Sequence, residues 1–217
     1  MIANYPSFAN YTVEREFVAY KNLKIRWCEE KHAQHIKFYI SDYLADSPPE
    51  IIDDLLNSLM DHIIGRRLNP HSVVFYSQKF LDYVNNPEYA RLHQRTFIRR
   101  HRSELTTDAE YQNLDQVVQR LKDYGFVPDI PDMKIFWSDT EDFLASSSII
   151  GKVVILSKRL DIPDIPEYVL DSLVYDQMML IDSGYLQNGQ SARFEPHPQM
   201  LDAMEWVHRR FGLEVKV

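Results

Sequence analysis

The chain contains a single cysteine, Cys28, and only six glycines among its 217 residues. One cysteine excludes an internal disulfide framework and any zinc site of the CxxC type. The glycines form neither a phosphate-binding loop nor a dinucleotide-binding fingerprint, which excludes these two nucleotide sites. Cys28 has no charged helix end and no assigned histidine partner in the sequence, so we do not expect it to act as a nucleophile.

Long apolar runs and an excess of basic residues are also missing. The sequence predicts no membrane span and no signal peptide, so we expect a soluble, cytoplasmic protein without a membrane partner. The net charge of -8 at pH 7 works against general nucleic-acid binding, which depends on clustered Lys and Arg. With 45% hydrophobic residues, the chain is long enough to bury a core in one large domain or in two small ones.

One segment departs from this acidic balance. Arg91, Arg95 and Arg99 recur at four-residue spacing, so a helix there would carry a basic stripe along one face. Two interpretations stay open. The stripe contacts nucleic acid, or it is a solvated face that pairs with carboxylates such as Glu88 and Glu104, and we favour the second.

Four landmarks occur twice in the same order along the chain. In the first copy they are Ile25-Arg26-Trp27, residues 36–41 with Leu44, Pro49-Glu50, and Asn69-Pro70-His71-Ser72. In the second copy they are Ile135-Phe136-Trp137, residues 153–157 with Leu160, Pro166-Glu167, and Glu195-Pro196-His197-Pro198. The recurrence favours an internal duplication. The alternative is that strands followed by amphipathic helices share such Ser and Pro signals in general.

Hydrophobic periodicity predicts the elements of each copy. In the first we expect a helix over residues 13–20, strands over 23–27 and 36–41, and helices over 49–64, 73–84 and from Pro87 through the stripe. Gly65 should end the long helix. In the second we expect helices over 114–121, 167–181 and 199–211, strands over 134–137 and 153–157, and a long connection over 138–151. The polar segment 103–113 separates the copies, which divides the chain into units 1–105 and 106–217.

The order of these signals resembles zincin metallopeptidases of the SprT-like and minimal gluzincin type. The resemblance rests on hydrophobic-Ser-x-x-Leu, then Pro-Glu, then Leu-Asp-x-Leu-Val-Tyr in a helix, then a later Pro-His. It implies an α+β fold of two tandem zincin-like units, each with a leading helix, a small sheet, a central helix and a closing helix. In that family the central helix carries HExxH, whose histidines and a downstream ligand hold zinc while the Glu acts as general base.

Neither copy contains HExxH. The resemblance places Ser58, Leu59 and His62 at the motif positions of the first copy, with His71 downstream. It places Asp176, Gln177 and Leu180 at those of the second, with His197 downstream. Leu59 cannot accept a proton and Gln177 has no titratable group, so the general base is missing from both copies. We therefore predict two relic sites without a catalytic residue, as in a pseudoenzyme.

His62 and His71 remain as candidate zinc ligands. The alternative, which we favour, makes them an edge-of-core histidine and a helix-start residue, so we expect no cofactor. Core packing is the expected role of Trp27, Trp137 and the methionines of the central helices.

The predicted function is a catalytically inactive, zincin-derived scaffold that binds a protein or peptide along a sheet edge. Two other functions stay open. One is a residual metal-dependent hydrolase that uses His62 and His71 with zinc, and the other is a nucleic-acid-associated protein that uses the helix over residues 91–102.

Overall fold

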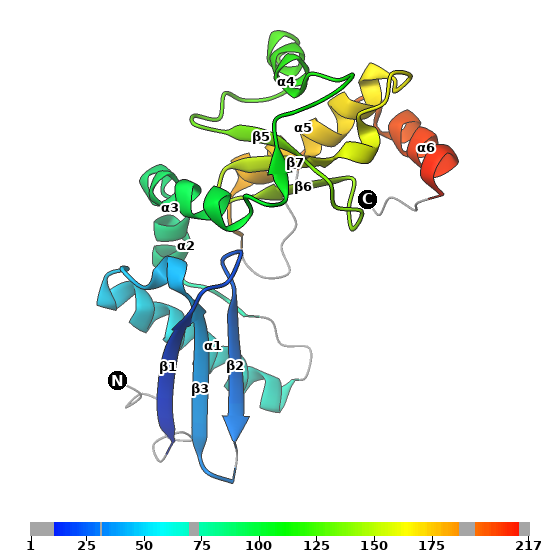
Figure 1. The fold of residues 1–217 in the computed structure, drawn as a ribbon. Helices are drawn as coiled ribbons and strands as arrows, with labels where there is room; N and C mark the ends of the chain where they lie inside the picture. Colours follow the sequence, from blue (N-terminus) through cyan, green and yellow to red (C-terminus); the bar gives the residue numbers. More distant parts are fainter. Residues whose placement is uncertain (1–10, 31, 70–73, 187–193, 213–217) are drawn as a thin grey trace. The chain divides into compact units, whose positions relative to one another are not determined.

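The computed structural model describes residues 11–30, 32–69, 74–186 and 194–212. The chain forms two compact units, residues 1–89 with 185–190 (unit 1) and residues 90–184 with 191–217 (unit 2). The described residues form a mixed α/β fold with six α-helices and two small sheets (Figure 1). The division between the units falls inside a helix, whereas the sequence-based division at residues 105 and 106 follows the repeated landmarks and stays a prediction. No helix in the described part of the chain is long and apolar enough to cross a membrane.

Unit 1 is built on a three-stranded sheet of β1 (Thr12–Val18), β2 (Ile25–Glu30) and β3 (His35–Ser41). The strand order is β1-β3-β2, with β1 parallel and β2 antiparallel to β3. Alternate side chains of β3, Ile36, Phe38 and Ile40, are fully buried. This period of two places one face of the sheet against the core, as the sequence pattern predicts.

The helices of unit 1 follow a short 3-10 turn, η2 (Asp42–Leu44). The long helix α1 (Pro49–Leu68) starts with proline and an acid in its first turn and lies across one face of the sheet (Figure 1). Its buried face carries apolar residues at helical spacing, namely Ile51, Ile52, Leu55, Leu59, Met60 and Ile63. The short helix α2 (Gln78–Val84) follows.

Unit 2 contains a four-stranded sheet of β4 (Leu105–Thr106), β5 (Lys134–Ser138), β6 (Ala145–Ser148) and β7 (Val153–Ser157). The order is β4-β5-β7-β6, with β5 parallel to β7 and both outer strands antiparallel to their neighbours. Its helices are α3 (Pro87–Arg100, most of which belongs to this unit), α4 (Leu114–Asp123), α5 (Glu167–Ser183) and α6 (Met200–Phe211). The 3-10 turn η3 (Lys158–Leu160) leads from β7 toward α5.

The two units share one strand order. In each, a central strand has a parallel neighbour on one side and an antiparallel neighbour on the other, and a 3-10 turn and a long helix follow. Ser41 and Ser157 end the central strands and are fully buried. Their N–H groups donate to the carbonyls of Lys24 and Leu144 at 2.9 and 2.8 Å. Each hydroxyl donates to a carbonyl of the connection before the antiparallel strand, at 3.4 Å in unit 1 and 2.9 Å in unit 2.

This strand order corrects one landmark of the sequence. Residues 25–27 form part of β2, which is antiparallel, whereas residues 135–137 lie in β5, which is the parallel neighbour. Pairing these two segments is therefore wrong, because β5 corresponds to β1 and β6 corresponds to β2. The landmarks at Ser41 and Ser157 and at the starts of the two long helices keep the same order in both units.

Several expected boundaries also change. Residues 13–20 do not form a helix, because residues 13–18 belong to the strand β1, which pairs in register with β3. The described part of unit 1 therefore has no helix ahead of its sheet. Gly65 does not end α1, which continues to Leu68. The helix expected from residue 73 starts at Gln78, and the connection over residues 138–151 contains β6, whose run of serines shows no apolar alternation.

Other expectations are confirmed. The strands over residues 36–41, 134–137 and 153–157 are present as β3, β5 and β7. The strand over 23–27 is present as β2, shifted toward its C-terminal end. The helices over 114–121, 167–181 and 199–211 are present as α4, α5 and α6, and the helix from Pro87 is present as α3.

Candidate functional site

The position that the resemblance assigns to the general base of unit 1 is part of the core. Leu59 is 1% exposed, on the buried face of α1. Ser58, at the position of the first histidine, is also buried, and its hydroxyl donates to the carbonyl of Asp54 at 3.1 Å. A serine that bonds back to its own helix in this way is satisfied locally. Neither side chain is available to bind a metal or to accept a proton from water.

His62 lies one turn further along α1 and faces the antiparallel edge strand. Its ring contacts the ring of Trp27 edge-on, with centroids 5.5 Å apart. The side chain is 7% exposed, and Nδ1 is buried without a hydrogen-bond partner among the described residues. His71 lies outside the described residues, so a pair of His62 and His71 stays a prediction.

The corresponding positions of unit 2 are less buried and carry no histidine. Asp176 and Gln177 are half-buried on α5, and Leu180 is 36% exposed. Burial raises the pKa of the Asp176 carboxyl to about 6. Leu180 has no donor atom for a metal. Within the described residues, no group of three or more His, Cys, Asp or Glu side chains could hold a metal ion.

His197 is buried, and it bonds to a residue that sequence reasoning did not select. Its Nδ1 lies 3.0 Å from the hydroxyl of Ser172, which is on α5 one turn before Asp176. The backbone N–H of Gln199 also donates to Nδ1, at 3.3 Å. Because Nδ1 accepts from this N–H, the hydrogen bonds assign the neutral ring with its proton on Nε2, and the serine hydroxyl is the donor. Burial lowers the pKa of His197, while the charge of Asp171 opposes that shift.

Aromatic rings complete this cluster. The His197 ring makes edge-on contacts with Phe126 and Tyr175, with centroids 5.2 and 5.6 Å apart. The Tyr175 hydroxyl donates to the carbonyl of Glu195 at 2.5 Å. The segment before α6 is thus attached to α5 by two hydrogen bonds from side chains. Ser172 is fully buried, so it has no access to a substrate as a nucleophile.

A buried ion pair connects α4 to α5. Nε of Arg120 donates to Oδ2 of Asp171 at 3.0 Å, and Nη2 donates to Oδ1 at 2.5 Å. Asp171 is buried, and Arg120 also lies 3.6 Å from the exposed carboxylate of Glu167. Two parallel hydrogen bonds from one guanidinium hold α4 and α5 in a defined relative position, in addition to the attraction between the two charges.

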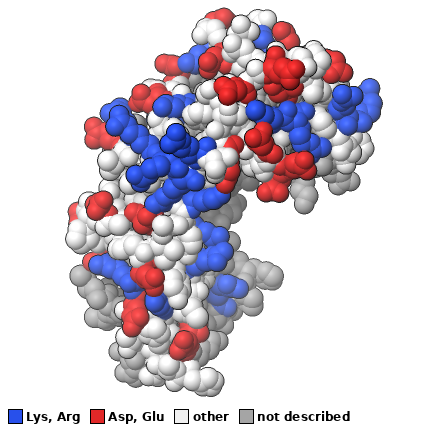
Figure 2. Space-filling model, in the orientation of Figure 1, with Lys and Arg blue, Asp and Glu red and all other residues white. Residues whose placement is uncertain are grey.

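The basic stripe lies on the exposed face of α3. Arg91, Arg95 and Arg99 are all exposed, and Figure 2 shows Lys and Arg side chains gathered over this helix. Arg91 pairs with Asp132 at 3.3 Å, an exposed contact of low energy, rather than with Glu88. The opposite face of α3 is buried in unit 2, where Nε2 of Gln94 donates to the carbonyls of Asp132 and Gly151 at 2.7 and 2.8 Å.

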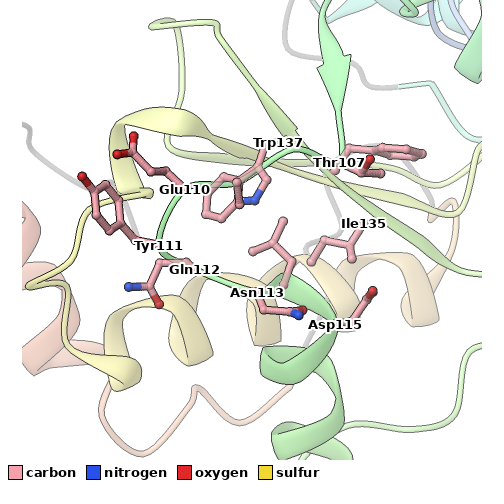
Figure 3. A pocket seen from close by; sticks show the side chains of 11 residues that line it. Thr107, Glu110, Tyr111, Gln112, Asn113, Asp115, Ile135 and Trp137 are labelled. Atoms are coloured by element: carbon pink, nitrogen blue, oxygen red, sulfur yellow. The ribbon is translucent and has the colours of Figure 1, made fainter.

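A pocket of about 340 Å³ opens beside β5 in unit 2. Figure 3 shows Trp137 and Ile135 of β5 among its labelled side chains, together with Glu110 and Asp115. The loop that carries Glu110 is fixed because the backbone N–H groups of residues 110–112 donate to the carboxylate of Asp161 at 2.7 to 3.0 Å. Both charged residues of the lining are acidic, so the pocket disfavours anions.

Sequence reasoning named residues 135–137 of this lining only as a strand landmark and as core, and did not predict a pocket there. It also missed Ser172 and the pair of Arg120 and Asp171. One signal was available, since Asp53 and Asp171 each follow the proline before their helix by five residues. Comparison of the chain with models of protein families, with curated proteins and with solved structures found no match.

Proposed function

We propose that the chain is a catalytically inactive scaffold, made of two tandem zincin-like units, that binds an extended segment of a protein partner along β2. Support for the two related units comes from their common strand order and from the buried serines Ser41 and Ser157 at the ends of the central strands. The single observation that carries the proposal is that the helix α1 packs beside the edge strand β2. There the general-base position is a buried leucine, while the edge strand beside it keeps an open backbone.

The absence of catalysis follows from the side chains at the base positions. Leu59 is sealed in the core of unit 1, and Gln177 in unit 2 has an amide that cannot take a proton from water at neutral pH. Since neither unit supplies a base, hydrolysis by the route of the resembling family has no residue to start it.

The open backbone of β2 follows from its pairing with β3. The bond from the Ser41 N–H to the Lys24 carbonyl makes residues 24 and 41 a hydrogen-bonded pair. Residues then alternate along the strand, so Ile25 and Trp27 direct their N–H and C=O groups away from β3. In the described sheet of unit 1, no strand lies on that side of β2. An extended peptide can add there as a fourth strand.

Trp27 gives this edge an apolar contact. Its half-buried ring packs edge-on against His62 of α1. His62 therefore supports the ring, a packing role that needs no metal.

Labelled β-casein, an unfolded protein, tests the proposal with the full chain. We expect a rise in fluorescence anisotropy on binding and no new fragments on a gel, with or without zinc. Ile25→Pro removes an outward N–H from the start of β2 and should weaken binding at least about fivefold, because a carbonyl of the peptide strand loses its N–H donor. Ile25→Thr keeps that N–H and a β-branched side chain, and is the matched control.

Two results would overturn the proposal. Equal affinity of the Pro and Thr variants, or no binding of casein at all, removes β2 as the binding edge. Zinc-dependent cleavage that a chelator stops and that His62→Ala abolishes would instead establish the residual hydrolase.

A further inference from the structure

In unit 2 the helix α4 packs against α5 and also contacts β5. Val117 and Leu121 of α4 are buried in the same core as Val174 and Met178 of α5. Between these apolar residues, Arg120 donates to Asp171 from Nε at 3.0 Å and from Nη2 at 2.5 Å. Apolar contacts and one buried ion pair thus fix α4 in place.

The matching side of α1 in unit 1 carries the same kinds of residue at the same positions. Pro48 and Pro166 cap the two helices. Counted from these prolines, Asp53 corresponds to Asp171 (53 − 48 = 171 − 166 = 5). By the same count Leu56 corresponds to Val174, at position 8, and Met60 corresponds to Met178, at position 12.

These three residues of unit 1 line a pocket instead of a helix contact. The pocket has a volume of about 290 Å³ and lies between α1 and β1, with Val13, Glu14 and Arg15 contributed by the strand. Leu56 remains half-buried, and Asp53 has no ion-pair partner among the described residues. No described helix of unit 1 occupies the place that α4 takes in unit 2.

We propose that this pocket binds an amphipathic helix of a partner protein in the way that α4 binds α5. The partner helix should present apolar side chains at spacings of three and four residues to Leu56 and Met60, and an Arg or Lys to Asp53. The charges of the lining favour a basic group, because Glu14 and Asp53 outnumber Arg15. The small volume fits side chains of a docked helix better than a separate small molecule.

This site is independent of the peptide edge proposed above. The strand order β1-β3-β2 puts β1 and β2 at opposite edges of the sheet of unit 1. Ile25→Pro should therefore leave helix binding unchanged, so that failure of one proposal is separable from failure of the other.

A labelled synthetic peptide of residues 113–125 of this chain, which contains α4 and its caps, is a suitable probe because it already pairs an arginine with the equivalent aspartate. We expect the full-length protein to raise the anisotropy of this peptide. Asp53→Arg should weaken binding at least about tenfold, as expected for reversal of a partly buried charge pair. A peptide with Arg120→Asp should also bind the wild-type protein weakly, but should recover most of its affinity for the Asp53→Arg protein.

The peptide could also bind unit 2 by displacing α4 from α5. The Asp53→Arg variant distinguishes this event from binding to the pocket, because α5 is unchanged in the variant. Binding that does not depend on residue 53, or no binding, would overturn the proposal. Sedimentation provides a second measurement. A dimer of the wild-type protein that Asp53→Arg dissociates would assign the pocket to a second copy of the chain and would refute the partner helix.

Discussion

The hydroxyl of Ser172 lies 3.0 Å from Nδ1 of His197, and both side chains are buried. The resemblance makes His197 a downstream metal ligand, whereas in the structure its Nδ1 accepts hydrogen bonds from α5 and from the backbone before α6. The two residues are 25 positions apart in the sequence. Their contact makes a residue of the relic site a structural link between two helices.

The first prediction concerns the pH dependence of stability. Burial lowers the pKa of His197 below its value in the unfolded chain, so the unfolded chain takes up a proton first as the pH falls. The free energy of unfolding should therefore decrease as the pH falls through about 6.5. Denaturant titrations at pH 7 and pH 5 should show a smaller decrease for His197→Gln. His208→Gln, an exposed site on α6, is the control, and an equal decrease in both variants would contradict the assignment.

Asp176 should change the stability of the fold with pH in the opposite direction. Burial raises the pKa of its carboxyl from 3.8 to about 6, so stability is lost as the pH rises through that range. Asp176→Asn removes the buried charge and should raise Tm by about 2–4 °C at pH 8, with no gain at pH 4. Thermal melts at both pH values test this, and Asp182→Asn on the exposed part of α5 should change neither. A gain of equal size at both pH values would exclude titration of Asp176 as the cause.

Leu59 tests whether unit 1 keeps a metal pocket. Leu59→Ala should cost about 2–5 kcal/mol in unfolding free energy, because it leaves a cavity in a packed core. Leu59→Glu restores the base of the resembling family. It should lower the unfolding free energy more than Leu59→Ala does, since an unpaired carboxylate enters an apolar site. Melts with and without zinc decide the question, and Asp61→Ala, exposed on the same helix, should be nearly neutral. Stabilisation of the Glu variant by zinc would argue for a dormant metalloenzyme.

The basic stripe on α3 should not bind nucleic acid, because the chain carries a net charge of -8 and Arg91 already contacts Asp132. We expect no salt-dependent binding of a short DNA duplex in anisotropy titrations. If binding does occur at physiological salt, reversing Arg95 and Arg99 to Glu should reduce the slope of log K against log salt by about two. That result would assign α3 to nucleic acid.

Local patterns in the sequence were sufficient for the strands and helices whose periodicity is strong. Buried alternation in β3 and the proline and acid at the starts of α1 and α5 each depend on neighbours within a few residues. The repeated Ser-x-x-Leu marks the ends of β3 and β7, and a 3-10 turn follows each strand.

Tertiary structure alone decided the rest. Val13, Phe17 and Val18 fit a helix by spacing, and only pairing with β3 makes their segment a strand, because ladder hydrogen bonds come from residues more than twenty positions away. The bond between Ser172 and His197 and the ion pair of Arg120 and Asp171 join residues 25 and 51 positions apart. No local pattern encodes such pairs, since each is set by how helices pack, and the candidate sites of this protein depend on them.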